Sequence, residues 1–190
     1  MSPNPPTPRY HPVSRIFHWA VALGVAVMIP VGILMTSGSV EGIQDELYIL
    51  HKGLGTILLV LVAARLAWRL FHSPPPMPES MPPGQRRTAR FVHGTLYALL
   101  VVMTTSGYVR TVGDGFPIEL LDALGLPYLL PEMPDVAAWM VLVHKGSAYL
   151  LAALVAAHVG AVVHAQLFAG HGVFRRMWPP VGGGGQKGEG

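Results

Sequence analysis

Four long apolar stretches dominate this sequence, and they leave few folds open to it. They cover roughly residues 16–36, 50–71, 91–109 and 138–168. Each reaches the ~20 residues that an α-helix needs to cross a ~30 Å hydrocarbon layer. Only 12% of the residues are charged, about half the fraction of an ordinary soluble domain. The sequence therefore predicts an all-α membrane protein, built as a bundle of four transmembrane helices.

The segments around these stretches predict how the chain is organised. We expect a polar N-terminal arm over residues 1–14, a four-helix membrane domain over 15–178 and a flexible glycine-rich tail over 179–190. The first apolar stretch is too long for a cleavable signal peptide, follows a proline-rich arm and has no A-x-A site after it. The proline-rich linker over 73–84 is expected to be extended. Helical spacing of apolar residues predicts a short interfacial helix in the loop after the third stretch.

Charged residues are distributed unevenly between the two sides of the predicted membrane. Ten of the 13 lysines and arginines lie in or next to the N-terminal arm, in the segments on either side of the linker, or at the C-terminal end. Eight of the 10 acidic residues lie on the opposite side. The positive-inside rule therefore places both termini in the cytoplasm. Because this bias accounts for the net charge of +3, no nucleic-acid partner is expected.

Histidine and cysteine usage is the second unusual feature, with 9 His and 0 Cys. Without cysteine the chain can form no disulfide, thiolate-bound zinc, iron–sulfur cluster or covalent c-type haem. Three histidines adjoin polar segments, where a solvated or interfacial role is expected: His11, His72 and His171. Six lie in the apolar stretches, where an ionisable side chain indicates a functional site: His18, His51, His93, His144, His158 and His164.

Spacing and depth sort these histidines into two layers. His144 and His158 share one face of the fourth stretch and lie ~21 Å apart along it, a separation that suits two stacked cofactors. The alternating direction of the helices places His51 near His144 at the outer leaflet and His18 near His158 at the inner leaflet. Two axial imidazoles on one iron are typical of an electron-transfer haem b inserted between helices. We therefore predict two haem b groups with His18, His51, His144 and His158 as metal ligands.

His93 is a third candidate in the inner layer. It could replace His18 as the partner of His158, donate a proton to a quinone, or be a buried, hydrogen-bonded histidine beside Tyr97. We favour His18 over His93 as the ligand.

Small and cationic residues near these histidines have alternative interpretations. Three glycines would let a macrocycle approach the backbone, or would simply allow close helix packing: Gly53, Gly55 and Gly146. Arg65 is a candidate partner for an inner haem propionate, or a snorkelling arginine. Lys52 and Lys145 could bind outer propionates or attract an anion, or anchor the helix ends.

A series of short motifs completes the pattern. They are Arg15-Ile16-Phe17-His18-Trp19, Leu50-His51-Lys52-Gly53, Arg65-Leu66-Ala67-Trp68-Arg69, the proline-rich linker, His93 with Tyr97, His144, and His158 ahead of Phe168. In order and spacing they resemble the bacterial cytochrome b561 family of di-haem inner-membrane proteins. The resemblance runs from about Tyr10 to Trp178.

The resemblance implies two b haems, one bound by His18 and His158 and the other by His51 and His144. It also implies electron exchange with ubiquinone or another quinone in a bacterial inner membrane. At least one family member looks like a superoxide oxidase, which takes an electron from periplasmic superoxide and reduces ubiquinone. With superoxide as donor, Lys52 and Lys145 would help steer the anion.

Two other functions stay open. The chain could be a cytochrome b subunit that passes electrons between a hydrogenase or formate dehydrogenase-type partner and quinone. The histidines could instead line a transition-metal transport path, but such a path prefers ligands through the whole membrane depth with carboxylate support. No Asp or Glu lies within the core of an apolar stretch, so metal transport fits less well.

Overall fold

The structure is a computed structural model that describes residues 8–40, 42–168 and 172–178. Its elements are α1 (Pro12–Ser37), α2 (Gln44–Phe71), α3 (Pro83–Gly113), α4 (Glu119–Ala123), α5 (Pro134–Leu167) and the short 3₁₀-helix η1 (Phe174–Arg176). The described residues contain no strand, and four of their helices are long and apolar enough to cross a membrane. The prediction of an all-α protein with four transmembrane helices is confirmed.

Each long helix begins before the apolar stretch that predicted it. The largest difference is in α3, which begins at Pro83 although its apolar stretch begins near residue 91. Proline occupies the first turn of α1, α3 and α5, where its missing N–H costs no helical hydrogen bond. Hydrophobicity marks only the part of a helix that faces lipid, so polar first turns are missed by an apolar pattern.

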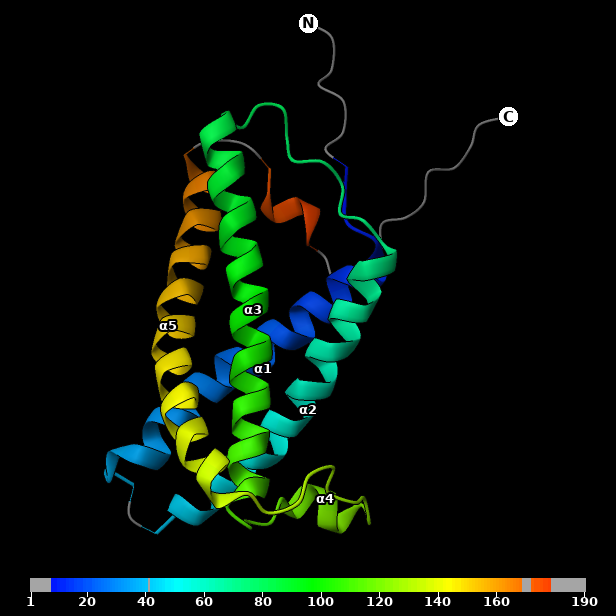
Figure 1. Cartoon of the computed structure of the whole chain (residues 1–190). Helices are drawn as coiled ribbons and strands as arrows, with labels where there is room; N and C mark the ends of the chain where they lie inside the picture. Colours follow the sequence, from blue (N-terminus) through cyan, green and yellow to red (C-terminus); the bar gives the residue numbers. More distant parts are fainter. Residues whose placement is uncertain (1–7, 41, 169–171, 179–190) are drawn as a thin grey trace, which may run out of the picture.

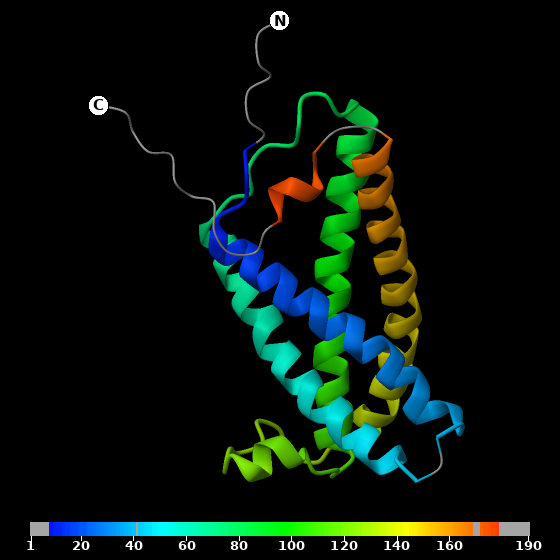
Figure 2. The same cartoon turned by 180° about the vertical axis from the view of Figure 1, so that it is seen from behind.

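The helices associate as two pairs, α1 with α2 and α3 with α5, and the contact of α2 with α3 joins the pairs. Figures 1 and 2 show the long helices running between two ends of the molecule, which we call the η1 end and the α4 end. Midway along the bundle, Val21, Val25 and Val62 form a buried apolar cluster. Partly buried residues from α3 and α5, Leu100 and Val155, pack against this cluster.

Large apolar side chains cover the outside of the bundle. Leu23, Val60 and Leu142 are 68%, 65% and 62% exposed, respectively. The most apolar windows of the four long helices are only 11–22% buried inside the protein. Such a surface is stable when lipid covers it, which agrees with an integral membrane protein.

At the α4 end, the loop between α3 and α5 folds against α2. The predicted short helix is present as α4, which is five residues long. The Lys52 ammonium donates hydrogen bonds to the Pro117 carbonyl and the Glu119 carboxylate, both at 2.7 Å. Partial burial raises the pKa of the Glu119 carboxyl, but the hydrogen bond and charge of Lys52 outweigh this effect, so the pKa lies below its ordinary value. Lys52 therefore anchors the loop to α2.

At the η1 end, Arg176 joins three segments that are distant in the sequence. Its side chain is 5% exposed and donates to the carbonyls of Pro8 at 3.0 Å, Pro75 at 3.1 Å and Pro76 at 2.6 Å. The Trp19 indole also donates to the Met177 carbonyl at 2.9 Å. We call residues 8–11, 72–82 and 172–178 together the cap.

The boundaries of the described chain differ from the predicted organisation at its N-terminal side. Helix α1 begins at Pro12, inside the arm predicted for residues 1–14. Proline at the first helical position and the acceptance of the Val13 N–H by His11 Nδ1 start the helix early. The predicted flexible tail over 179–190 lies outside the described residues.

Loss of the Arg176 side chain should loosen the cap. Arg176→Gln removes hydrogen bonds from a charged donor, which are worth about 1.5–3 kcal/mol each, to prolyl carbonyls in two segments. We expect faster cleavage by trypsin at Arg86, Arg87 and Arg90, measured on the purified protein.

The control is Arg175→Gln, since the Arg175 side chain is exposed. Its cleavage rate should match that of the wild type. Equal rates for both variants and the wild type would contradict a structural role for Arg176.

Candidate functional site

Near the α4 end, His51 of α2 and His144 of α5 face each other. Their ring centroids are 6.1 Å apart and their planes are 82° apart. Helices α2 and α5 both begin at the α4 end, so histidines in their early turns reach the same depth. The two rings come from different helix pairs, which places them on opposite sides of the space between the pairs.

A hydrogen bond fixes the orientation of the His144 ring. His144 Nδ1 lies 3.0 Å from the Met103 carbonyl oxygen and 3.3 Å from the Ser106 hydroxyl. A carbonyl oxygen only accepts, so Nδ1 carries the proton and donates. The neutral ring then keeps a lone pair on Nε2, which is the arrangement of a metal-ligating histidine.

His51 has an unsatisfied nitrogen inside the protein. Its Nδ1 is buried and has no hydrogen-bond partner among the described residues. Burying a polar group without a partner costs free energy, and such a group at a candidate site points to a missing ligand or water. His51 and His144 thus both present imidazoles that the protein alone leaves incompletely satisfied.

The spacing of these two rings fits one metal ion between them. Metal–imidazole bonds are about 2 Å long, and ring centroids 6.1 Å apart leave room for one ion between the two rings. Among the described residues, no group of three or more His, Cys, Asp or Glu side chains could hold a metal ion. A metal held here by only two protein ligands needs its other ligands from a cofactor, as a haem macrocycle provides.

Two glycines that the sequence interpretation missed provide space for these rings. A Cβ on Gly107 would lie 2.8 Å from His144 Cε1, and one on Gly32 would lie 3.4 Å from His51 Cε1. Both glycines lie near the ends of the helices that run towards the α4 end, α1 and α3. Comparing the depth of every glycine with that of the histidines would have found them.

The three glycines chosen from the sequence have other neighbours. A Cβ on Gly53 would face Leu120 of α4 at 3.5 Å, and one on Gly55 would face the Met28 methyl group at 3.5 Å. A Cβ on Gly146 would have no described heavy atom within 4 Å. Gly53 and Gly55 therefore border apolar side chains and not a histidine ring.

Three histidines gather in the half of the bundle nearer the η1 end. The rings of His93 on α3 and His158 on α5 are 5.4 Å apart at 67°. His18 on α1 lies within electrostatic range of both. The structure thus brings His18 and His158 into one group, as expected, and adds His93 in ring contact with His158.

Arg65 lies beside this group with part of its guanidinium free. Its Nε donates to the Tyr97 hydroxyl at 2.9 Å, and its guanidinium carbon lies 5.2 Å from the centre of the Tyr97 ring. Its Nη1 is buried without a hydrogen-bond partner in the described part of the chain. Arg65 is within electrostatic range of His18 and His158. A partly buried cation with an unused donor is suited to bind a carboxylate.

The remaining described histidines lie outside these two groups. His11 and His72 are exposed, and the ring of His72 stacks on Trp68 at 3.6 Å and 5°. His164 is exposed on α5 with its ring 5.4 Å from that of Phe168. The exposure of His11 and His72 agrees with the solvated or interfacial role expected for them. His171 lies outside the described residues.

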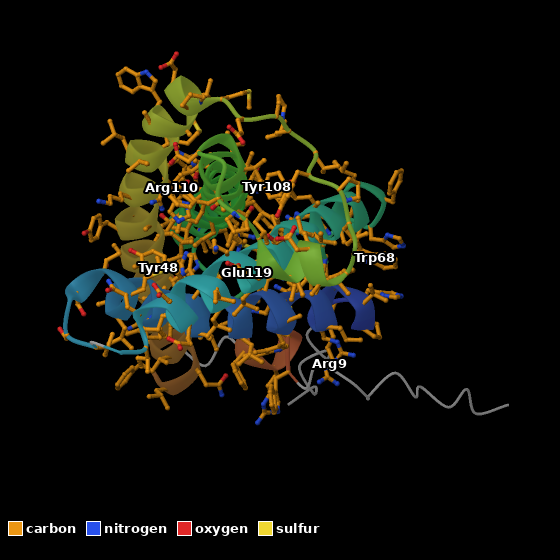
Figure 3. The ribbon with its side chains drawn as sticks, turned by 90° about the horizontal axis from the view of Figure 1, so that it is seen from below. Arg9, Tyr48, Trp68, Tyr108, Arg110 and Glu119 are labelled. Carbon is orange, nitrogen blue, oxygen red and sulfur yellow. The ribbon has the colours of Figure 1, made fainter. Side chains whose placement is uncertain are left out.

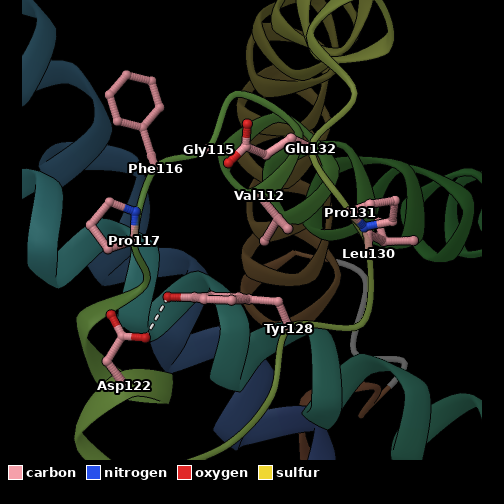
Figure 4. A pocket seen from close by; sticks show the side chains of 9 residues that line it. All are labelled: Val112, Gly115, Phe116, Pro117, Asp122, Tyr128, Leu130, Pro131 and Glu132. Carbon is pink, nitrogen blue, oxygen red and sulfur yellow. Dashed lines mark hydrogen bonds between the residues drawn. The ribbon is translucent and has the colours of Figure 1, made fainter.

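A separate cavity of about 470 Å³ lies in the loop region of the α4 end. Figure 4 shows Tyr128 facing Asp122 there, with Val112 and Glu132 also in the lining. The Tyr128 hydroxyl donates to Asp122 at 2.6 Å, and this hydrogen bond raises the pKa of Tyr128. None of the described histidines lines this cavity, so it is distinct from both histidine groups.

Comparisons with known proteins show which family the chain belongs to. The family model described as prokaryotic cytochrome b561 matches residues 9–180. Cytochrome b561 homolog 2 of Escherichia coli (strain K12) is 34% identical over 125 residues. That match covers 65% of this chain and 66% of the relative, just under two thirds of the relative's length. Membership of such a family implies a b-type haem, electron transport and a transmembrane location. The chain, with paired histidines inside four membrane helices, belongs to the prokaryotic cytochrome b561 family.

Proposed function

We propose that this protein transfers electrons across the membrane, between the α4 end and the quinone pool, through two b haems that are each bound by two histidines. The observation that carries the proposal is the His51–His144 pair, whose rings are 6.1 Å apart. His144 has its Nδ1 proton donated to a carbonyl, so its other nitrogen is free to bind iron. Haem, when bound, supplies the one-electron carrier.

The chain's own residues would orient and insulate this carrier. The Met103 carbonyl and Ser106 hold the His144 ring, and such outer contacts fix the direction of a ligating imidazole. The buried cluster of Val21, Val25 and Val62 separates the two histidine groups with apolar side chains. Apolar surroundings keep water away from a redox centre and so help to set its potential.

For the second haem we propose His18 and His158 as ligands. His51 and His144 come from different helix pairs, and a haem there would lie between the pairs. His18 on α1 and His158 on α5 repeat this arrangement, whereas His93 and His158 come from α3 and α5 of the same pair. His93, in ring contact with His158, is then suited to exchange protons with a quinone, because an imidazole has one nitrogen that donates and one that accepts.

The orientation and location follow from charge. The η1 end carries the arginine-rich segments, so the positive-inside rule supports a cytoplasmic η1 end, with both termini, in a bacterial inner membrane. The donor would then act from the periplasmic side.

Superoxide and a partner protein are both candidates for this donor. Lys52, which could have attracted superoxide, is bound to Glu119 and Pro117. Seven described acidic residues face three basic ones at the α4 end: Asp45, Glu46, Asp114, Glu119, Asp122, Glu132 and Asp135 against Lys52, Arg110 and Lys145. This charge favours the second candidate function, that of a cytochrome b subunit which receives electrons from a protein partner.

The decisive experiment is an absorption spectrum and haem assay of the purified protein. The proposal predicts two low-spin b haems per chain. Protein that folds in the membrane and binds no haem would overturn it.

Gly107→Ala should selectively disturb the haem at the α4 end. The new methyl group would lie 2.8 Å from His144 Cε1, so the ring must move from its hydrogen bond with Met103. We expect the haem-to-protein ratio to fall by up to half, with a loss of low-spin absorbance.

Gly84→Ala at the other end of α3 is the matched control, because a Cβ there meets no described atom within 4 Å. If Gly107→Ala bound as much low-spin haem as Gly84→Ala, the His144 ring would not be the ligand.

Separate substitution of His18 and His93 should identify the ligand at the η1 end. His18→Ala is expected to lose one haem, because no other described α1 residue can replace an imidazole there. His93→Ala should keep both haems and slow quinone reduction. Haem content measured on both variants decides the assignment, and loss of a haem only in His93→Ala would reverse it.

A further inference from the structure

Arg110 is a cation near the α4 end whose surroundings the preceding sections do not explain. It lies in the last turn of α3 and is partly buried. The described residues offer its guanidinium no hydrogen bond and no ion pair, and the single salt bridge among them joins Lys52 to Glu119. Seven described carboxylates lie at the same end of the protein, yet none of them forms an ion pair with Arg110.

The register of α3 directs Arg110 towards the His51–His144 pair. Met103 accepts the hydrogen bond of His144, and Gly107 borders its ring. Residues 103, 107 and 110 are spaced by four and three, so they share one face of the helix. Arg110 is three residues, or ~4.5 Å along the axis, beyond Gly107. It therefore follows the histidine contacts along α3, towards the α4 end.

Electrostatic proximity gives the same placement. Arg110 lies within electrostatic range of both His51 and His144. Tyr108, two residues earlier and ~200° around the helix, faces away and accepts a hydrogen bond from the Leu129 N–H. Figure 3, which looks onto the α4 end, shows Arg110 and Tyr108 on opposite sides of α3. Arg65 has the equivalent relation to the histidines of the η1 end.

We propose that Arg110 binds a carboxylate of the cofactor held by His51 and His144, and that its charge raises the reduction potential of that cofactor. Guanidinium binds carboxylates in a forked geometry, and haem b carries two propionate carboxylates. A nearby positive charge favours the reduced form, which holds one more electron. This inference rests on the proposed function, because it needs a haem at that histidine pair.

The test is a spectroelectrochemical titration of the purified holoprotein and its variants. In Arg110→Gln, the equilibrium constant for reducing one haem should fall on the order of tenfold, which is about 59 mV for a one-electron couple. The other haem should keep its potential. Arg110→Lys should restore most of the potential, since it keeps the charge.

A second readout follows the carboxylate itself. The redox-induced infrared difference spectrum should show a carboxylate band that shifts in Arg110→Gln and in Arg110→Lys, because neither side chain has the guanidinium fork. Arg87→Gln, which removes an exposed cation from the opposite end of α3, is the matched control and should change neither readout.

The possible results separate this inference from the proposed function. Two bound haems with unchanged potentials and unchanged infrared bands in Arg110→Gln would overturn the role of Arg110 and leave the proposed function intact. A wild-type potential that changes when chloride replaces sulfate at constant ionic strength would assign Arg110 to a solution anion and overturn the cofactor contact. A protein without haem would overturn both.

Discussion

An imidazole inside a membrane bundle must find partners for its nitrogens, and this requirement accounts for much of the structure described here. His144 satisfies Nδ1 with the Met103 carbonyl, which needs α3 and α5 in close contact and glycine at position 107. His51 has no such partner among the described residues. The protein thus holds one ring rigidly and leaves an opposing ring incompletely bonded, an arrangement that binding of a shared metal would complete.

The sequence allowed the prediction of the helices and of the depth of each histidine. Long apolar stretches and alternating helix direction were sufficient to bring His51 together with His144. Depth alone could not distinguish His18 from His93, because both lie early in helices that begin at the η1 end. That distinction depends on which helices pack against each other. The four helices have similar apolar surfaces, so their sequences do not show which of them pack together.

The neighbours of glycine and lysine residues were harder to predict from the sequence than the positions of the histidines. Gly32 and Gly107 were missed because a glycine has no side chain to indicate its neighbour. Lys52 was considered for anion binding because its position near His51 was visible, whereas its contacts with Pro117 and Glu119 depend on how a distant loop folds. Arg110 lies two residues beyond Tyr108 in the sequence. Only the helical register shows that Arg110 lies on the side of the histidines, whereas Tyr108 contacts the loop at Leu129.

The Arg176 contacts also limit the order in which the protein can assemble. Arg176 follows all four membrane helices in the chain, yet its acceptors belong to Pro8, Pro75 and Pro76. During synthesis these carbonyls emerge long before their donor, so the hydrogen bonds that join the three segments of the cap form only after α5 has been made.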